Sequence, residues 1–282
     1  MAAPVVVDYR PAVNNPRQFY KLTGSGNDFV FFELAERPGA HMVSMFSAEW
    51  VRALCARGTG VGADGVVFVV RMMPASLGIF YLNADGSQAS LCGNATLCTV
   101  RLASLLGLPA EVTILTEAGE IPGRLVDGQP EIDLDPVKSL AADQPVTTRP
   151  VSARRIGFAL VGVPHLVVLV DDVEAIDVVA EGARLRHDPM LGAPGANVNF
   201  VTPAGRMRTY ERGVEGETLA CGTGAVATAA LLVAWGLGKS PVSLTTRSGS
   251  KLTVRFGEQT ASLSGEGRLV FTGQLPEAAK RS

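Results

Sequence analysis

The feature that most constrains the fold of this chain is an internal repeat. In each copy a cysteine and a glycine open an apolar run that ends at another glycine, and the two copies occupy 92–107 and 221–236. The runs are apolar on nearly all sides, as in a helix that is buried inside its lobe. A strand-like alternation closed by glycine follows each run, at 111–119 and 242–249. The repeat predicts two similar lobes that each place one thiol at a helix start.

Most of the remaining segments alternate like strands. The ranges 18–34 and 156–170 both indicate two strands around a turn, with the second turn expected at 162–165. Further helices are predicted at 47–57, with Ser47 as the N-cap, and more weakly at 173–182. We therefore expect an α/β (α+β) fold of two pseudo-symmetric domains, each a strongly bent, mixed or antiparallel sheet wrapped around its central helix.

The segment 136–150 is rich in proline, alanine, aspartate and threonine and lacks periodicity, which is typical of a linker. It places the domain boundary near Ser139, with an N-terminal lobe at 1–138 and a C-terminal lobe at 139–267.

Length and charge exclude several classes of function. The chain has 282 residues, 47% of them hydrophobic, so it can bury the core of two domains. Its net charge is −2, and no basic stripe favours nucleic acid or anionic lipid. The segment 1–16 lacks the apolar region of a secretory signal, and no apolar run is long enough to span a bilayer. We expect a cytoplasmic protein, with reduced cysteines, that acts on a small neutral or zwitterionic partner.

The chemistry is predicted where the two repeated helices begin. A helix N-terminus carries partial positive charge and lowers the pKa of a cysteine placed there, so Cys92 and Cys221 are candidate nucleophiles or bases. If both sulfurs flank one pocket, the first thiolate raises the pKa of the second thiol, which favours one base and one acid. Such a pair can invert an α-carbon by removing a proton from one face and delivering one to the other. Backbone N–H groups at 93–94 and 222–223 could bind the substrate carboxylate. No cofactor is obligatory for this reaction, and no residue spacing indicates a metal site.

Several short strings are spread along most of the chain. They are Gly26-Asn27-Asp28-Phe29, Asn83-Ala84-Asp85-Gly86-Ser87, Cys92-Gly93-Asn94, Pro164-His165, Asn197-Val198-Asn199-Phe200, Glu211-Arg212-Gly213 and Gly216 to Gly224. In this order they resemble the motifs of the diaminopimelate epimerase family.

The resemblance implies a pyridoxal-independent epimerase that converts LL-diaminopimelate to the meso form for lysine and peptidoglycan synthesis. It implies two α/β domains with the active site between them, and a C-terminal strand at about 268–282 that returns to the first lobe. A homodimer is also expected from it. Cys92 and Cys221 would be the acid/base pair, and Gly93, Asn94, Gly222 and Thr223 would bind the reacting carboxylate. Asn27, Asn83, Asn197, Glu211 and Arg212 would hold the distal amino-acid end.

Three departures from the family pattern concern the substrate. Val163 stands where an asparagine commonly precedes Pro-His, Ala95 and Leu97 replace the usual glycine and arginine, and Glu215 lengthens the spacing to Cys221 by one residue. A racemase of another amino acid, such as histidine, is therefore the second hypothesis. A two-lobed small-molecule binding protein without catalysis is the third.

The other candidate residues have simpler interpretations. Cys55 and Cys98 are expected in the core. His165 is expected to orient neighbouring groups rather than to transfer protons. The string at 60–65 fits G-x-G-x-x-G, but it precedes a strand instead of following one, so a tight turn is favoured over a dinucleotide site.

Overall fold

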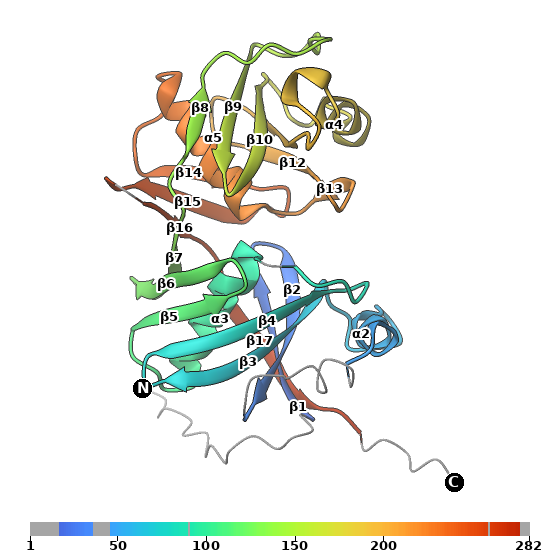
Figure 1. The fold of residues 1–282 in the computed structure, drawn as a ribbon, viewed down its shortest axis with the longest axis vertical. Coiled ribbons are helices and arrows are strands. Elements are labelled where there is room, and N and C mark those ends of the chain that lie inside the picture. The colour runs from blue at the N-terminus through green and yellow to red at the C-terminus, as the bar shows by residue number, and fades with distance from the viewer. Residues whose placement is uncertain (1–16, 36–45, 90, 259, 277–282) are drawn as a thin grey trace.

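The computed structural model describes residues 17–35, 46–89, 91–258 and 260–276. The chain forms two lobes stacked along its longest axis, joined at a narrow waist where β7 and β16 lie side by side (Figure 1). The segment 1–16, in which no secretory signal was recognised, lies outside the described residues, as do residues 277–282 of the predicted C-terminal strand.

The first lobe follows the order that the alternation predicted, with strands before and after one buried helix. Its elements are β1 (Gln18–Gly24), β2 (Asn27–Leu34), α2 (Ala48–Cys55), β3 (Gly65–Met73), β4 (Ser76–Asn83), α3 (Gly93–Leu105), β5 (Glu111–Thr116), β6 (Gly119–Val126) and β7 (Gln129–Leu134). Ser47 caps α2 as expected, because its hydroxyl accepts from the N–H of Trp50 at 3.2 Å.

The second half repeats this plan with a further helix on the outer face. Its elements are β8 (Ser139–Ala141), β9 (Arg155–Val161), β10 (Val163–Leu169), α4 (Val178–Arg186), η1 (Pro189–Leu191), β11 (Asn197–Val201), β12 (Met207–Glu211), β13 (Gly216–Thr218), α5 (Gly222–Ala234), β14 (Val242–Thr245), β15 (Lys251–Phe256), β16 (Ala261–Ser264) and β17 (Arg268–Gln274).

The two halves exchange strands. β7 pairs antiparallel with β16, which joins strands of both halves into one sheet of order β14-β15-β16-β7-β6-β5-β4-β3-β2-β1-β17. After β7 the chain crosses to pair β8 with β9 in the second sheet, of order β13-β12-β11-β10-β9-β8. After β16 it crosses back, and β17 pairs with β1 of the first lobe. The domain limits at 138 and 267 stay a prediction.

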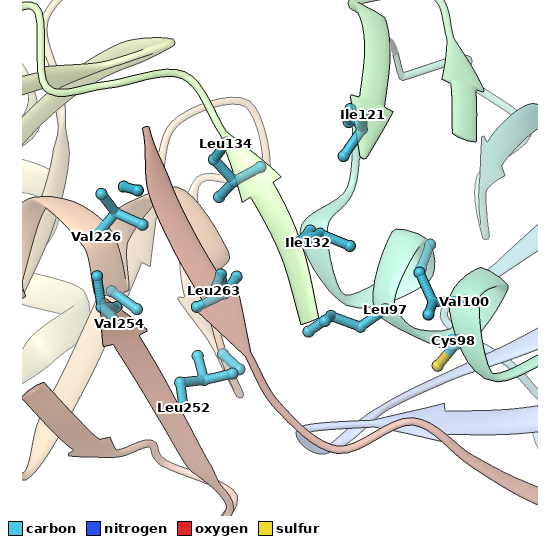
Figure 2. Close-up of a cluster of buried hydrophobic side chains, with 14 of the residues drawn as sticks. Leu97, Cys98, Val100, Ile121, Ile132, Leu134, Val226, Leu252, Val254 and Leu263 are labelled. Carbon is cyan, nitrogen blue, oxygen red and sulfur yellow. The ribbon is translucent and has the colours of Figure 1, made fainter. Parts of the chain in front are cut away.

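The hydrophobic core is continuous across the waist. Leu263 of β16 lies opposite Ile132 of β7, and both belong to one buried cluster that includes Leu97 of α3 and Val226 of α5 (Figure 2). Arg124 covers this junction, because its guanidinium bonds the carboxylates of β7 and, at 3.1 Å, the hydroxyl of Ser262 on β16. The shared core fixes the two buried helices relative to each other.

The predicted fold class is confirmed, and both repeated helices are buried as expected. Local details differ. The weak helix predicted at 173–182 is α4 at Val178–Arg186, because Asp177 supplies the N-cap by accepting from the N–H of Ala180. The second turn is confined to Gly162, at φ 65°, and 163–165 are already strand. The linker at 136–150 contains β8. None of the helices in the described residues is long and apolar enough to cross a membrane.

Candidate active site

The starts of the two repeated helices lie directly against each other. Cys92 is the N-cap of α3 and Cys221 is the N-cap of α5, both with extended backbone. A Cβ built on Gly93 would lie 3.6 Å from Cα of Gly222, and a Cβ built on Gly222 would lie 3.6 Å from Cα of Gly93. The near-symmetric approach brings both cysteines, and the free N–H groups of both helices, to one place. All four cysteines of the chain are free thiols, and Cys55 and Cys98 are buried in the core as expected.

Glycine is required beside at least one of the cysteines. A Cβ on Gly222 would come within 2.9 Å of Cδ2 of Leu263, whereas the same atom on Gly93 would keep 3.8 Å from it. Glycine at position 222 therefore avoids a close contact with Leu263, whereas position 93 has room for a Cβ.

Burial favours the protonated form of both thiols by raising their pKa values. Burial raises the pKa of Cys92 to about 11, although the N–H groups of Ala95 and Asn94 lower it. Burial also raises the pKa of Cys221 well above its usual value, against the lowering effect of the Gly224 N–H. The N–H groups at the helix starts lower the pKa of both thiols, as expected, but burial of a charged sulfur raises it by more.

Glu211 lies beside the Cys221 thiol, to which it is hydrogen-bonded. Its carboxylate accepts from the hydroxyl of Thr218 at 2.5 Å, and its charge raises the pKa of the Cys221 thiol. Burial raises the pKa of Glu211 itself, while Thr218 and Cys221 lower it. The resemblance assigned Glu211 to the distal end of the substrate. β13 folds back on β12 and carries the chain from Glu211 directly to the start of α5, and the assignment of Glu211 to the distal end of the substrate stays a prediction.

Asn27 and Asn94 form an amide pair at the start of α3, in which Asn94 is buried and Asn27 is partly buried. Asn94 donates to Oδ1 of Asn27 at 2.7 Å, and Asn27 donates to Asp64 at 3.0 Å. Oδ1 of Asn94 is buried and has no hydrogen-bond partner within the part of the chain that the structure describes. Asn27 thus lies beside the start of α3, and its assignment to the distal end of the substrate stays a prediction.

Asn197, the first residue of β11, and Arg212, in the turn after β12, lie together in the second lobe. The N–H of Arg212 donates to Oδ1 of Asn197 at 2.7 Å. Among the described residues the Arg212 guanidinium forms no ion pair with a carboxylate, so its charge is available to an anion. Asn83 lies at the end of β4, where it donates to Oγ of Ser87 at 3.0 Å. Thr223 lies at the first turn of α5, with its hydroxyl 3.7 Å from Sγ of Cys221.

His165 is buried, neutral and fixed in one tautomer. Asn199 donates to the carbonyl of Leu166 and to Nδ1 of His165, each at 3.3 Å, which leaves the imidazole proton on Nε2. Nε2 is buried without a partner in the described residues. Burial, and then the charge of Arg212, lower the pKa of His165 to about 3. A neutral imidazole that presents an N–H fits the orienting role expected from the sequence.

Two positioning residues were missed by the sequence analysis. Asp64 holds Asn27 and is itself held by Arg57 at 2.8 Å and by the N–H of Asp28 at 3.1 Å. It lies in the 60–65 string, which is a turn before β3 as predicted, and the turn places Asp64 under Asn27. Asn199 was visible in the Asn-Val-Asn string, where the alternation of a strand puts it on the same side as Asn197.

The residues that depart from the family pattern lie in different environments. Ala95 and Leu97 are fully buried in the core of α3. Glu215 is in the turn between β12 and β13, where it pairs with Arg186 at 3.2 Å. Val163 begins β10, opposite Val161 of β9.

Comparisons with known proteins identify the family. A family model described as diaminopimelate epimerase matches residues 19–139 and 157–271. The diaminopimelate epimerase of Gemmatimonas aurantiaca is 43% identical over 276 residues, which cover 91% of this chain and 98% of that protein. That of Methanocella arvoryzae is 36% identical over 273 residues, covering 92% and 96%. In fold, the chain is similar to a Bacillus anthracis phenazine biosynthesis protein of the PhzF family, with a TM-score of 0.69, 14% identity, and coverage of 93% and 99%.

Proposed function

The chain belongs to the diaminopimelate epimerase family, and from this we propose that it inverts the α-carbon of an amino acid by proton transfer between Cys92 and Cys221. The substrate we propose is LL-diaminopimelate, converted to the meso form. The observation that carries the proposal is the contact between the two helix starts, in which Gly93 and Gly222 approach within van der Waals distance and each is preceded by a thiol.

Inversion needs a base on one face of the carbon and an acid on the other. One thiolate takes the α-proton, and the opposite thiol gives its own proton to the carbanion, so that the two cysteines exchange protonation states in each turnover. A second turnover in the same direction requires the thiols to be reset. No other chemical group is consumed, and the mechanism requires no cofactor.

The first thiolate must form against the effect of burial. We propose that Glu211 accepts the proton of Cys221 when substrate binds, since its carboxylate lies beside that thiol and has a raised pKa. The ammonium group of the substrate and the starts of α3 and α5 then stabilise the negative sulfur.

The N–H groups at Gly93, Asn94, Gly222 and Thr223 are proposed to bind the reacting carboxylate. Eight backbone N–H groups at the two helix starts lack partners within their helices, four from each. Charge moves onto the carboxylate as the α-proton leaves, so hydrogen bonds that are already in place stabilise the transition state more than the substrate.

Arg212 supports a substrate with a second carboxylate. Its guanidinium forms no ion pair within the described residues, and its neighbours Asn197 and His165 offer an amide and a neutral imidazole N–H. An arginine binds a carboxylate through two parallel hydrogen bonds. Asn83 is proposed to complete this distal site. Diaminopimelate has both a carboxylate and an ammonium group at its far end.

The test is proton exchange in deuterated water. Wild-type protein incubated with LL-diaminopimelate should give the meso form and introduce deuterium at one α-position, both followed by mass spectrometry and chiral separation. Cys92→Ala and Cys221→Ala should each lose epimerisation by at least about a thousandfold. Cys55→Ala is the matched control, because Cys55 is a buried thiol away from the helix starts and its loss should leave turnover intact.

The same assay separates the alternatives. Faster exchange with L-histidine than with diaminopimelate would assign the chain to racemisation of another amino acid, for which Val163 is the motivating departure. Binding of diaminopimelate without any exchange would show a binding protein and refute the proposal.

The cellular role and assembly are also proposed. The product is consumed in lysine and peptidoglycan synthesis, and a pair of thiols that must stay reduced is suited to the cytoplasm. We propose a homodimer, supported by the edge strand β17, where the side chains of Val270 and Phe271 are nearly half exposed. Light scattering of the purified chain measures its mass directly.

A further inference from the structure

An aromatic ring covers the first residue of β3. A Cβ built on Gly65 would lie 2.6 Å from Cε2 of Tyr81 and 2.9 Å from its hydroxyl oxygen. These distances are shorter than real Cβ contacts, so the ring and hydroxyl of Tyr81 occupy the space of a side chain at position 65. Gly65 is needed here because of the Tyr81 ring and of the backbone oxygen of Leu82, which would lie 2.7 Å from the same Cβ.

The register of the sheet shows where the hydroxyl points. Phe29, Gly65 and Asn83 are partners across β2, β3 and β4 and lie in one row, while Tyr81 lies in the next row, opposite Val67. Because the ring leans from its own row over Gly65, the hydroxyl is directed toward the end of β4. The chain leaves β4 at Asn83 and reaches Cys92 at the start of α3.

The ring itself is held firmly. It packs edge-on against Phe29, with centroids 6.0 Å apart and planes at 76°, and Tyr81 is only 9% exposed. Removal of the hydroxyl alone should therefore leave the ring in place.

The hydroxyl has the chemistry of a hydrogen-bond donor. It makes no hydrogen bond to the protein within the described part of the chain, although a nearly buried phenol usually finds a partner. Burial, followed by the charges of Cys92 and Asp64, raises the pKa of Tyr81, so the phenol stays protonated across the working pH range.

We propose that Tyr81 is a substrate-binding residue whose hydroxyl donates a hydrogen bond to a carboxylate of the amino-acid substrate. The proposal rests on the function proposed above. Tyr81 belongs to none of the motifs that carry the family resemblance, and its position depends on the absence of a side chain at Gly65. The pair Gly65 and Tyr81 thereby becomes a determinant of substrate affinity in this chain.

The experiment is the substitution Tyr81→Phe, assayed with diaminopimelate over a range of concentrations. Loss of one hydrogen bond to a charged group should raise KM by about tenfold, with kcat changed less than about twofold. The thermal midpoint should stay within about 2 °C of wild type, because the packing of the ring is kept. The wild-type rate, measured in parallel, tests the proposed function. The ratio of the KM of Tyr81→Phe to the KM of wild type tests the role of Tyr81.

Tyr210→Phe is the matched control. Tyr210 also lies on a strand, and its hydroxyl is 3.3 Å from Glu215, but its ring packs against Gly182 of α4 on the outer face of the second sheet. This variant should leave KM unchanged. Unchanged KM in Tyr81→Phe would overturn the proposal, and so would a fall in kcat alone, which would mean that the hydroxyl serves the chemical step rather than binding.

Discussion

Alkylation of Cys92 at different pH values tests whether its thiol is protonated in the substrate-free protein. Burial raises the pKa of this group from 9.0 to about 11, so at pH 8 its thiolate fraction is about a hundredfold lower than that of an unburied thiol. A thiolate of higher pKa is intrinsically more nucleophilic, which recovers about fivefold to tenfold of that loss. Carboxamidomethylation by iodoacetamide should therefore be about tenfold to twentyfold slower than in the urea-unfolded protein.

The pH dependence is the sharper measurement, because intrinsic nucleophilicity does not change with pH. The rate at Cys92, followed by peptide mass spectrometry, should rise about tenfold per pH unit from pH 7 to pH 9.5 without levelling off. A plateau below pH 9 would refute the reasoning, since it would show a thiolate stabilised by the helix start in spite of burial.

Glu211→Gln independently tests what raises the pKa of the Cys92 thiol. Burial is the largest cause of the raised pKa of Cys92, and the charge of Glu211 raises this pKa further. Removal of that charge should increase the alkylation rate at fixed pH and move the whole profile to lower pH, while its slope stays the same. An unchanged profile would mean that Glu211 does not influence the thiol at this distance.

Two further predictions follow from the same region. Gly222→Ala should lower the free energy of unfolding by about 1–3 kcal/mol, since its Cβ would lie 2.9 Å from Leu263. Gly93→Ala should lower it by less than about 1 kcal/mol, because the same distance is 3.8 Å. Urea unfolding measures both, and equal losses would contradict the geometry. His165 should make the protein less stable as pH falls from about 6.5 to about 3, because the unfolded state takes up a proton that the buried imidazole beside Arg212 refuses. The contribution is at most about 5 kcal/mol. His165→Asn should flatten the stability profile in that window, and an unchanged slope would show that His165 is protonated in the folded protein.

The general plan of the fold could be predicted because the sequence contains an internal repeat, and each copy indicates the same arrangement. The apolar runs after Cys92 and Cys221 are too uniformly hydrophobic for a surface helix, and both helices are buried. The return of β17 to the first lobe was beyond local pattern and was expected only from the family resemblance. β17 is largely exposed and its partner β1 is distant in sequence, so only the assembled core selects the pairing.

The candidate site residues could be named from the family resemblance, but their contacts could not. The resemblance placed Glu211 with Arg212 at the distal end, which stays a prediction, and nothing in the sequence indicated that the Glu211 side chain lies beside Cys221. The raised pKa of the thiols could not be predicted either, because it depends on contacts between segments that are distant in sequence. A sequence shows that a cysteine begins a helix, but the extent of burial is set by residues such as Leu263, which belong to another strand.

The backbone of the site is nearly symmetric, and its chemistry is not. The helix starts at Cys92 and Cys221 have nearly the same geometry, but the neighbours of the two thiols differ. Glu211 hydrogen-bonds the Cys221 thiol and acts on Cys92 only through its charge, while Asn94, which follows Cys92, donates to Asn27 and, at 3.4 Å, to the carbonyl of Ala220. An epimerase needs this combination. Symmetry places two similar groups on opposite faces of one carbon, while the unequal neighbours ensure that one sulfur gives up its proton first. The two single-cysteine variants should therefore differ in which isomer of the substrate still shows residual α-proton exchange.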